Sequence, residues 1–334
     1  MKIAIIGTDF LPMQGGIATW AFDVATALSR HGHDVTVLSR MAPDPKCPFR
    51  MIKCHGRSWN THRAKWIGLA CLRLPNIDLA IFATWDSALW AAPYLHKKGV
   101  RVFCAVHGSE VTRPDLPKEK LLQLAAHIDH WIPVSQFLAS CLIEWLPTLP
   151  YTILPYPLDH QPKPNPPHVN GPLLCAARLV ESKNIPFAIQ LAHALKRELW
   201  VCGSGPLEAE FRQMYGASVQ FYGHMERQEL QKLYATAAGV VLCSQTDLNG
   251  FGAEGFGLCL LEATAHGIPT IGTNVGGIPE AIGQGILIDA EAPNLQSIQN
   301  YLAHPQSGTD NWLWHQAHHG QAAFCQALEQ ICLP

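Results

Sequence analysis

The stretch Glu254-Gly-Phe-Gly-Leu-Cys-Leu-Leu-Glu262 predicts a glycine-rich bend that runs into a short apolar helix. Gly255 and Gly257 disfavour helix formation, since glycine in a helix costs roughly 1 kcal/mol relative to alanine. We therefore expect the helix to begin near Leu258. It should end at Gly267, because glycine commonly follows the last turn of a helix. Strand-to-helix turns of this kind are typical of α/β folds.

The same stretch places two carboxylates around the bend. Glu254 precedes the helix, and Glu262 lies just past its first turn. The free backbone N–H groups at the helix start point into the same space. Carboxylates accept hydrogen bonds from sugar hydroxyls and N–H groups bind anions, so the segment predicts a site for a sugar joined to phosphate. The alternative is a turn required only by the fold, with solvated glutamates.

On either side of this stretch, short β-branched runs alternate with helical patterns, which is typical of parallel sheets with crossover helices. In the first half we expect strands at Ile3–Gly7, Val35–Ser39, Leu79–Ala83, Val102–Val106 and Trp131–Val134. In the second half we expect strands at Leu173–Ala177, Leu199–Cys202, Val219–Tyr222, Val240–Cys243, Thr270–Gly272 and Ile286–Ile288. The pattern predicts two doubly wound, Rossmann-like α/β domains facing across a cleft.

A proline-rich stretch separates the two halves. Gln161-Pro-Lys-Pro-Asn-Pro-Pro167 cannot lie inside a helix or sheet, so it is the candidate domain linker. We expect an N-terminal domain over 1–160, a linker over 161–171 and a C-terminal domain over 172–312. The remaining residues, 313–334, should carry a helix from His315 to Ile331 that packs back across the linker onto the N-terminal domain.

Composition sets further bounds. The 334 residues are 48% hydrophobic and 15% charged, with a formal net charge of −2, which excludes a disordered chain and argues against a nucleic-acid partner. Residues 1–160 carry 16 Lys and Arg against 12 Asp and Glu, whereas residues 161–334 carry 8 against 14. The basic N-terminal half could rest on an anionic membrane surface, although a scattered solvated face would look the same.

The cysteines and histidines do not predict a metal site. The 11 cysteines form no C-x-x-C pair and the 17 histidines are scattered, so we expect free thiols in a reducing cytosol. No D-x-D pair offers magnesium ligands, and we expect neither a metal nor a resident cofactor. The chain contains no signal peptide pattern and no 18-residue apolar span, which predicts a cytoplasmic protein, either soluble or peripheral at the inner face of a membrane.

Three further motifs follow predicted strands. In Pro12-Met-Gln-Gly-Gly16, Gly15 and Gly16 would let backbone N–H groups approach a phosphate, although a turn required by geometry is an equal alternative. In Ala177-Arg-Leu-Val-Glu-Ser-Lys-Asn184, Arg178 and Lys183 could hold a diphosphate or be solvated, with Asn184 capping the next helix. His107 could bind a substrate hydroxyl or be structural.

Two weaker motifs are strand-to-loop exits whose backbone could frame a flat base. They are Val201-Cys-Gly-Ser-Gly-Pro206, which contains Gly203, and Phe221-Tyr-Gly-His-Met225. Taken alone, each is a generic turn.

In their order along the chain, these residues resemble glycosyltransferase family 4. The resemblance rests on the following segments: Pro12–Gly16, His107-Gly-Ser-Glu110, Arg178 to Lys183, Gly203-Ser-Gly-Pro206, Glu254 to Glu262 and Asn274-Val-Gly-Gly-Ile-Pro-Glu280. It covers Met1 to about Ile288, and the pair of glutamates with seven residues between them is its specific part. Asp247-Leu-Asn-Gly-Phe-Gly-Ala-Glu254 resembles the subgroup of phosphatidylinositol mannoside mannosyltransferases. The family has the GT-B fold and uses nucleotide sugars with retention of anomeric configuration.

The resemblance implies a role for each matching residue. Arg178 and Lys183 would grip the donor diphosphate, with a backbone N–H from Gly16. Glu254 and His107 would contact the transferred sugar, helped by the backbone at Phe256, Gly257 and Leu258. Glu262 would bind the ribose hydroxyls, and the base would lie against His224 and Met225. The family needs no metal for this chemistry.

The implied activity is transfer of a hexosyl group, such as mannosyl or glucosyl, from a UDP- or GDP-linked donor to a glycan or glycolipid hydroxyl, in polysaccharide or lipopolysaccharide synthesis of the cell envelope. One region departs from the family, because Leu154-Pro-Tyr-Pro-Leu-Asp159 replaces the usual Pro-Asn-Gly-Val-Asp.

Two alternatives belong to other classes. The first is a nicotinamide-dependent oxidoreductase or epimerase, which would need a G-x-G-x-x-G after the first strand, and this loop lacks one. The second is a non-catalytic nucleotide-sugar-binding protein that kept the site without turnover.

Overall fold

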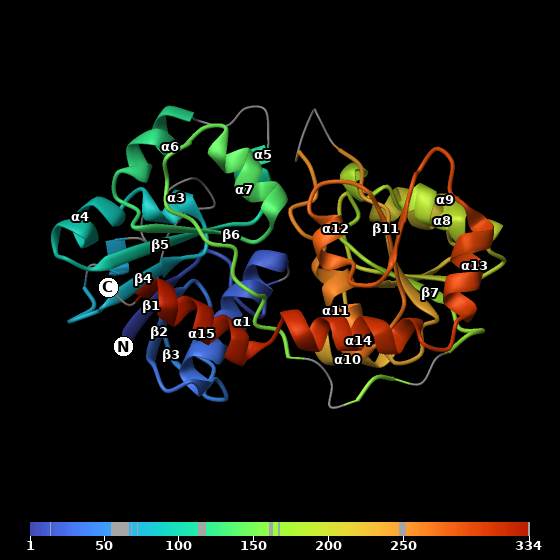
Figure 1. Ribbon diagram of the computed structural model, residues 1–334, viewed down its shortest axis with the longest axis horizontal. Helices are drawn as coiled ribbons and strands as arrows, with labels where there is room; N and C mark the ends of the chain where they lie inside the picture. Colours follow the sequence, from blue (N-terminus) through green and yellow to red (C-terminus); the bar gives the residue numbers. More distant parts are fainter. Residues whose placement is uncertain are drawn as a thin grey trace. The chain divides into compact units, whose positions relative to one another are not determined.

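The computed structural model divides the chain into two compact units, which are described separately (Figure 1). Residues 1–157 and 320–334 form the first unit, and residues 158–319 form the second. The structure describes residues 1–13, 15–54, 67, 69–71, 73–112, 118–159, 163–165, 168–246 and 252–332.

The first unit is built on a six-stranded sheet in the order β3-β2-β1-β4-β5-β6, in which neighbouring strands run parallel. The strands are β1 (Lys2–Ile6), β2 (Asp34–Ser39), β3 (Arg50–Lys53), β4 (Leu79–Phe82), β5 (Arg101–Val106) and β6 (His130–Pro133). The helices are α1 (Gly16–Arg30), α3 (Trp85–Ala88), α4 (Ala92–Lys97), α5 (Ser109–Thr112), α6 (Lys118–Ala125), α7 (Gln136–Ile143) and α15 (Gln321–Cys332). In this unit α15 packs beside α1, although the two are nearly 300 residues apart.

The second unit repeats this topology in the order β12-β11-β10-β7-β8-β9, again with parallel neighbours. Its strands are β7 (Leu173–Ala176), β8 (Leu199–Cys202), β9 (Gln220–Gly223), β10 (Gly239–Leu242), β11 (Thr270–Thr273) and β12 (Ile286–Ile288). Its helices are the 3-10 turn η1 (Glu181–Lys183), α8 (Ile185–Ala194), α9 (Glu208–Tyr215), α10 (Arg227–Tyr234), α11 (Leu258–His266), α12 (Ile278–Ala281), α13 (Leu295–Ala303) and α14 (Ser307–His318).

Both faces of the second sheet are buried, because successive strand residues enter different apolar clusters. Leu173 and Cys175 join the cluster that also holds residues of α8 and α13, whereas Leu174 joins the cluster with residues of α10, α11 and α12. Helices on both faces explain why these strands are continuous hydrophobic runs and do not alternate with polar residues. This arrangement confirms the predicted class of two doubly wound α/β sheets.

The structure corrects the sequence reading at three places. The strand β3 was not predicted, because its four residues, Arg-Met-Ile-Lys, are charged at both ends. The helix expected from His315 to Ile331 is interrupted, since α14 ends at His318 and Gly320 has a φ of 120°. Asn184 precedes α8 in the left-handed conformation, and its side chain makes no capping hydrogen bond.

The linker is described only in part. Residues 161–162 and 166–167 of the predicted proline-rich linker lie outside the described residues. Asn165 donates its backbone N–H to the carbonyl of His266 at 3.0 Å, and a side chain at Gly267 would meet Pro164. The described part of this segment therefore lies against the C-terminal end of α11, within the second unit.

Candidate functional site

The glycine-rich bend and its helix form as the sequence predicted. Helix α11 begins at Leu258 and ends at His266, with Gly257 before it at a φ of 102° and Gly267 after it at 71°. Such positive φ values are readily adopted only by glycine, so both ends of the helix are fixed by residue type. Residues 247–251 of the expected mannosyltransferase-like stretch lie outside the described residues.

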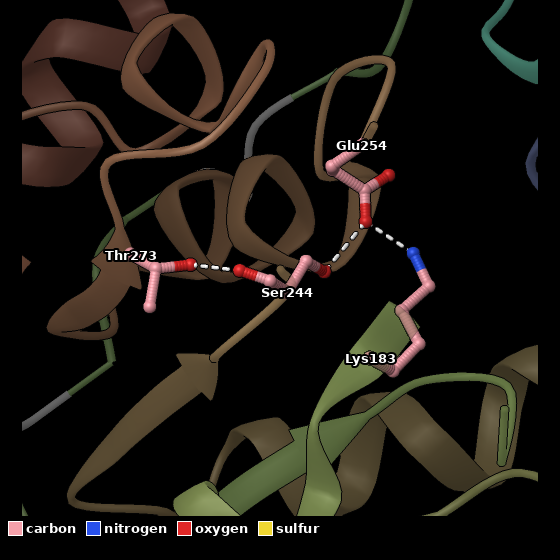
Figure 2. Close-up of polar contacts among 4 residues, drawn as sticks. All are labelled: Lys183, Ser244, Glu254 and Thr273. Carbon is pink, nitrogen blue, oxygen red and sulfur yellow. Dashed lines mark hydrogen bonds and ion pairs between the residues drawn. The ribbon is translucent and has the colours of Figure 1, made fainter. Parts of the chain in front are cut away.

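Lys183 and Glu254, predicted as separate site residues, are in direct contact (Figure 2). The ammonium Nζ of Lys183 donates to Oε2 of Glu254. The two side chains are 22% and 13% exposed, so the ion pair is largely shielded but reachable from solvent. Lys183 comes from η1, which follows β7, and Glu254 comes from the loop after β10, so adjacent parallel strands bring them to the carboxyl edge of the sheet.

The Glu254 carboxylate has two further hydrogen-bond donors. The hydroxyl of Ser244 donates to Oε2 at 3.0 Å, and the backbone N–H of Phe256 also donates to this carboxylate. Burial would raise the pKa of Glu254, but the Lys183 charge and these hydrogen bonds hold it below its ordinary value. Burial would likewise lower the pKa of Lys183, but Glu254 raises it. Both groups are therefore ionised at neutral pH.

The loop after β11 fixes the backbone of the bend. Gly277 donates its N–H to the carbonyl of Glu254 at 2.9 Å. A Cβ at Gly276 would lie 2.1 Å from that same carbonyl oxygen, and one at Gly277 would lie 2.2 Å from the carbonyl of Gly255. The two glycines in Asn274-Val-Gly-Gly-Ile-Pro-Glu280 are thus needed for this close backbone contact.

Glu262 has a different partner. The hydroxyl of Tyr234, on α10, donates to Oε2 of Glu262 at 2.9 Å. Burial, and then the nearby Glu262 charge, raise the pKa of Tyr234 well above its ordinary value, so the phenol stays protonated. Glu262 also lines a small hollow together with Asp159, Arg227 and Gln231. The two glutamates of one motif therefore face separate polar groups.

The remaining sequence-predicted residues of the second unit divide between exposed and packed positions. Arg178 is exposed in the loop after β7, and His224 is exposed with Nε2 3.9 Å from Oε1 of Glu226. Met225 is packed, because its sulfur lies 3.5 Å from that of Cys202. Phe256 and Leu258 are half-buried, and the Phe256 ring lies 6.5 Å from that of His319.

Glycine is required at residue 203 for a structural reason that could not be predicted from the sequence. Its φ is 137°, and a Cβ there would lie 2.0 Å from the carbonyl oxygen of Ala177. Its own N–H donates to the carbonyl of Gly223 at 2.7 Å. The Gly203 loop is therefore packed on the backbone beside Arg178, and this N–H is already used within the protein.

In the first unit, Gly15 and Gly16 lie at the start of α1 and, unlike Gly203, are not packed against the backbone of another loop. Among the described residues, no heavy atom lies within 4 Å of a Cβ built at either position. The φ of Gly15 is 128°, which accounts for glycine at that position, whereas Gly16 has no such requirement. The neighbouring chain thus gives no packing reason for glycine at residue 16.

His107 follows β5, and its ring contacts Trp20 and Ala83. Its ring lies edge-on to Trp20 of α1, with centroids 4.9 Å apart, and it hydrogen-bonds to the backbone of Ala83. Burial lowers the pKa of His107 to about 4, against the opposing effect of the Ala83 bond. The ring is therefore neutral at pH 7, and its Nε2 has no hydrogen-bond partner among the residues that the structure describes. It can accept a hydrogen bond from a hydroxyl.

Sequence reasoning missed two hydroxyl groups of the site, those of Ser244 and Tyr234. Ser244 lies two residues beyond β10, so its position at a strand's carboxyl end could have indicated it. Tyr234 lies on α10 and gave no comparable indication, because a tyrosine on a helix usually serves packing.

The described residues contain neither a metal-binding cluster nor a membrane-spanning helix. No group of three or more His, Cys, Asp or Glu side chains that could hold a metal ion is found in the part of the chain that the structure describes. Within the same residues, every helix is too short or too polar to cross a membrane.

Two sequence families match this chain. Residues 14–161 match the sequence family described as Glycosyltransferase Family 4, and residues 159–303 match the one described as Glycosyl transferases group 1. The chain belongs to glycosyltransferase family 4. The Glu254 bend, Lys183 and Glu262 all fall within the second match.

One curated relative and two solved structures are similar to this chain. A GDP-mannose-dependent monoacylated alpha-(1-6)-phosphatidylinositol monomannoside mannosyltransferase of Corynebacterium glutamicum is 28% identical over 138 residues. That match covers 39% of this chain and 36% of the relative, so it spans about a third of the length of such relatives.

The solved structures show the fold over nearly the whole chain. Sucrose-phosphate synthase of Thermosynechococcus elongatus has a TM-score of 0.78 and 18% identity, covering 99% of this chain and 98% of that one. The Anabaena protein HepE, in complex with UDP and glucose, has a TM-score of 0.76 and 14% identity, covering 99% of each chain. These likenesses confirm the GT-B fold.

Proposed function

We propose that this chain is a retaining glycosyltransferase that moves a hexosyl group from a nucleoside-diphosphate sugar to a hydroxyl of a glycan or glycolipid. The observation that carries the proposal is the contact between Lys183 and Glu254 at the carboxyl edge of the second sheet. A shielded cation beside a shielded carboxylate offers a diphosphate and a sugar hydroxyl one partner each.

Lys183 and Arg178 bind the donor diphosphate in this proposal. Both follow β7 in the same loop, and Arg178 is exposed. Negative charge on the diphosphate grows as it leaves the sugar, so fixed cations stabilise the transition state more than the ground state. The departing group then needs no metal ion from this chain.

Glu254 accepts hydrogen bonds from the hydroxyls of the transferred sugar. Its low pKa keeps it an acceptor at neutral pH. The Phe256 N–H already donates to Glu254, so of the three backbone positions expected to help, Gly257 and Leu258 at the start of α11 remain the better candidates. Glu262, beside its hollow, would bind the ribose hydroxyls, and the base would lie against His224 and Met225.

Residues of the first unit have proposed roles of the same kind. The open space around Gly16 would admit a phosphate oxygen to its backbone N–H. The unpartnered Nε2 of His107 would accept a hydrogen bond from a sugar hydroxyl. Since His107 is neutral, this contact would orient the sugar and would not repel an oxocarbenium-like transition state.

The donor base, sugar and acceptor follow from relatives by analogy only. The Corynebacterium relative is named as GDP-mannose-dependent, and HepE is in complex with UDP and glucose. We therefore propose a UDP- or GDP-linked hexose as donor and cell-envelope glycan synthesis as the setting.

Peripheral association with an anionic membrane is a further part of the proposal. Trp90 and Tyr94, beside and within α4, are 44% and 46% exposed. Lys97 and Lys98 follow, and Lys98 Nζ lies 4.5 Å above the Tyr94 ring. Exposed aromatic rings beside lysines are typical of surfaces that meet anionic headgroups. In a sedimentation assay with phosphatidylglycerol vesicles, the wild type should pellet with the vesicles and the double variant Lys97→Glu, Lys98→Glu should stay in the supernatant. Equal binding of both proteins would contradict the proposed membrane association.

The central test is a thermal-shift panel. UDP, GDP and ADP, each with its sugar conjugate, are compared with NAD and NADP. We expect one nucleoside diphosphate class to raise the melting temperature of the wild type and to leave Lys183→Met unchanged. A matched control is Lys196→Met, because Lys196 precedes β8 at the opposite edge of the sheet. A shift with NAD alone would favour the oxidoreductase alternative.

A second assay separates an enzyme from a binding protein. Donor hydrolysis or transfer that is lost in Glu254→Ala but kept in Lys196→Met would exclude the non-catalytic alternative. Nucleotide binding without any turnover of UDP- or GDP-sugars would support the alternative of a non-catalytic binding protein.

A further inference from the structure

Ser244 is a buried hydroxyl at the site for which the proposed function has no role. It lies two residues beyond β10 and is 2% exposed. Its Oγ donates to Oε2 of Glu254 at 3.0 Å, the same oxygen that accepts from Lys183 (Figure 2). One carboxylate oxygen thus has two donors, one charged and one neutral.

Ser244 is itself held from two sides. The hydroxyl of Thr273, the last residue of β11, donates to the Ser244 carbonyl at 2.5 Å (Figure 2). The next residue, Gln245, donates its backbone N–H to the carbonyl of Ser182 at 2.8 Å, immediately before Lys183. The backbone that carries the Ser244 hydroxyl is therefore fixed relative to β11 and to η1, by contacts that do not involve Glu254.

The two donors on Oε2 differ in what a diphosphate would do to them. A diphosphate attracts the Lys183 ammonium, which then shares or leaves its contact with Glu254. The neutral hydroxyl of Ser244 has no such attraction, and its backbone anchors lie on other strands. A largely buried carboxylate that loses a cation tends to move or to take up a proton unless other donors remain.

We propose that Ser244 is a positioning residue that keeps the Glu254 carboxylate ionised and in place when Lys183 turns to the donor diphosphate. This inference rests on the proposed function of Lys183 and Glu254. Thr273 contributes by fixing the Ser244 carbonyl. The bend that carries Glu254 contains two glycines and no helical residue before Leu258, so its side chain depends on such contacts for its orientation.

The test compares Ser244→Ala with a matched buried serine of the same unit. Ser307 is 4% exposed and donates one hydrogen bond, to the carbonyl of His304 at 2.9 Å, so Ser307→Ala loses a similar bond away from the site. Steady-state kinetics are measured for the full chain with UDP-glucose and GDP-mannose as probes, together with melting temperatures.

In Ser244→Ala we expect kcat to fall about 10- to 100-fold with little change in KM, the range for a lost hydrogen bond to a charged group. The acid limb of the pH profile should move to higher pH, because a lost donor raises the pKa of the carboxylate. Ser307→Ala should keep the wild-type kcat and acid limb, whatever its melting temperature. A merely structural role for Ser244 would lower stability and leave the acid limb unmoved.

A second pair of variants covers the case in which Ser244→Ala does not fold. Thr273→Val removes the hydroxyl that holds Ser244, whereas Thr273→Ser keeps it. We expect the acid limb of Thr273→Val to move in the same direction and that of Thr273→Ser to stay in place.

The outcomes are distinguishable. Ser244→Ala with the wild-type kcat and acid limb would overturn the inference and leave the proposed function intact. If the wild type turns over neither probe and gains no thermal stability from UDP or GDP, the proposed function fails, and the role of Ser244 fails with it.

Discussion

The two units have the same strand order, yet the buried titratable groups at their carboxyl edges differ: they are ionised in the second unit and biased towards the neutral form in the first. In the second unit, Lys183 and Glu254 are both held ionised. In the first unit, burial lowers the pKa of His107 to about 4 and raises that of Glu110, so each is biased towards its neutral form. One topology therefore supports two kinds of site, and what decides between them is whether a buried group has an oppositely charged partner.

The same contrast separates the glycines of the two units. A Cβ added at Gly203 or Gly276 would lie about 2 Å from a backbone carbonyl oxygen, whereas a Cβ added at Gly16 would face open space. Glycine in the second unit serves the contact of loops with each other. In the proposed function, glycine at residue 16 would leave room for a ligand.

The largest effect should come from breaking the ion pair of the second unit. Lys183→Met removes the cation that meets the diphosphate and leaves Glu254 without its charged partner. We expect kcat with UDP-glucose or GDP-mannose to fall roughly 10²- to 10³-fold, as for other groups that stabilise a transition-state charge. Lys196→Met is the control, and an equal loss in both variants would contradict the assignment.

The next effect should come from the glycine contrast, measured as the free energy of unfolding. Gly203→Ala forces a Cβ to within 2.0 Å of the Ala177 carbonyl at a φ of 137°, so we expect it to destabilise by more than about 2 kcal/mol. Gly16→Ala should stay within about 0.5 kcal/mol of the wild type while weakening nucleotide binding. Equal stability changes would show that the packing difference is not real.

A smaller effect is expected at Glu262. Tyr234→Phe removes the hydrogen bond to this carboxylate, and we expect about a tenfold loss of affinity for the nucleoside diphosphate, the low end for a bond to a charged group. Isothermal titration with the 2′- and 3′-deoxy nucleotides provides the control. If Glu262 binds the ribose, the variant should lose less affinity for a deoxy nucleotide than for the parent. Equal losses would place the ribose elsewhere.

A further effect is expected in the first unit, as a pH dependence of stability. The pKa of His107 lies near 4 in the folded chain and near 6.5 when unfolded, so between these values the unfolded state binds the extra proton. The stability from its neutral ring is full above pH 6.5 and is lost as the pH falls towards 4. Urea unfolding of His107→Gln should show a shallower loss between pH 6.5 and 4.5 than the wild type.

His266 provides the matched variant in the second unit. Burial, and then Arg227, lower the pKa of His266 to about 4 as well, so His266→Gln should flatten the same pH range. A wild-type slope in either variant would show that the histidine concerned is not buried as a neutral ring.

Much of this arrangement could be predicted from the sequence, because the signals were local. β-branched runs located most strands, and Gly257 and Gly267 set the ends of α11 to the residue. The strand β3 was missed because charged residues at both ends of a four-residue segment conceal its apolar centre. The break at Gly320 was missed because a single glycine within a helical pattern does not by itself mark a helix end, and the apolar residues that indicated the helix all follow it.

The contacts within the site could not be predicted in the same way. Lys183 and Glu254 are 71 residues apart, and only the adjacency of β7 and β10 brings them together. The spacing of residues does not show that Ser244 and Tyr234 each donate to one of the two glutamates. Such pairings depend on sheet order, which a single sequence does not fix.

The most direct test of the ion-pair site is a crystal structure of the chain with the nucleoside diphosphate that gives the largest thermal shift. We expect a phosphate oxygen within hydrogen-bond distance of Lys183 Nζ, with Glu254 still accepting from Ser244. A diphosphate bound away from Lys183, with the Lys183–Glu254 contact unchanged, would contradict the proposed site.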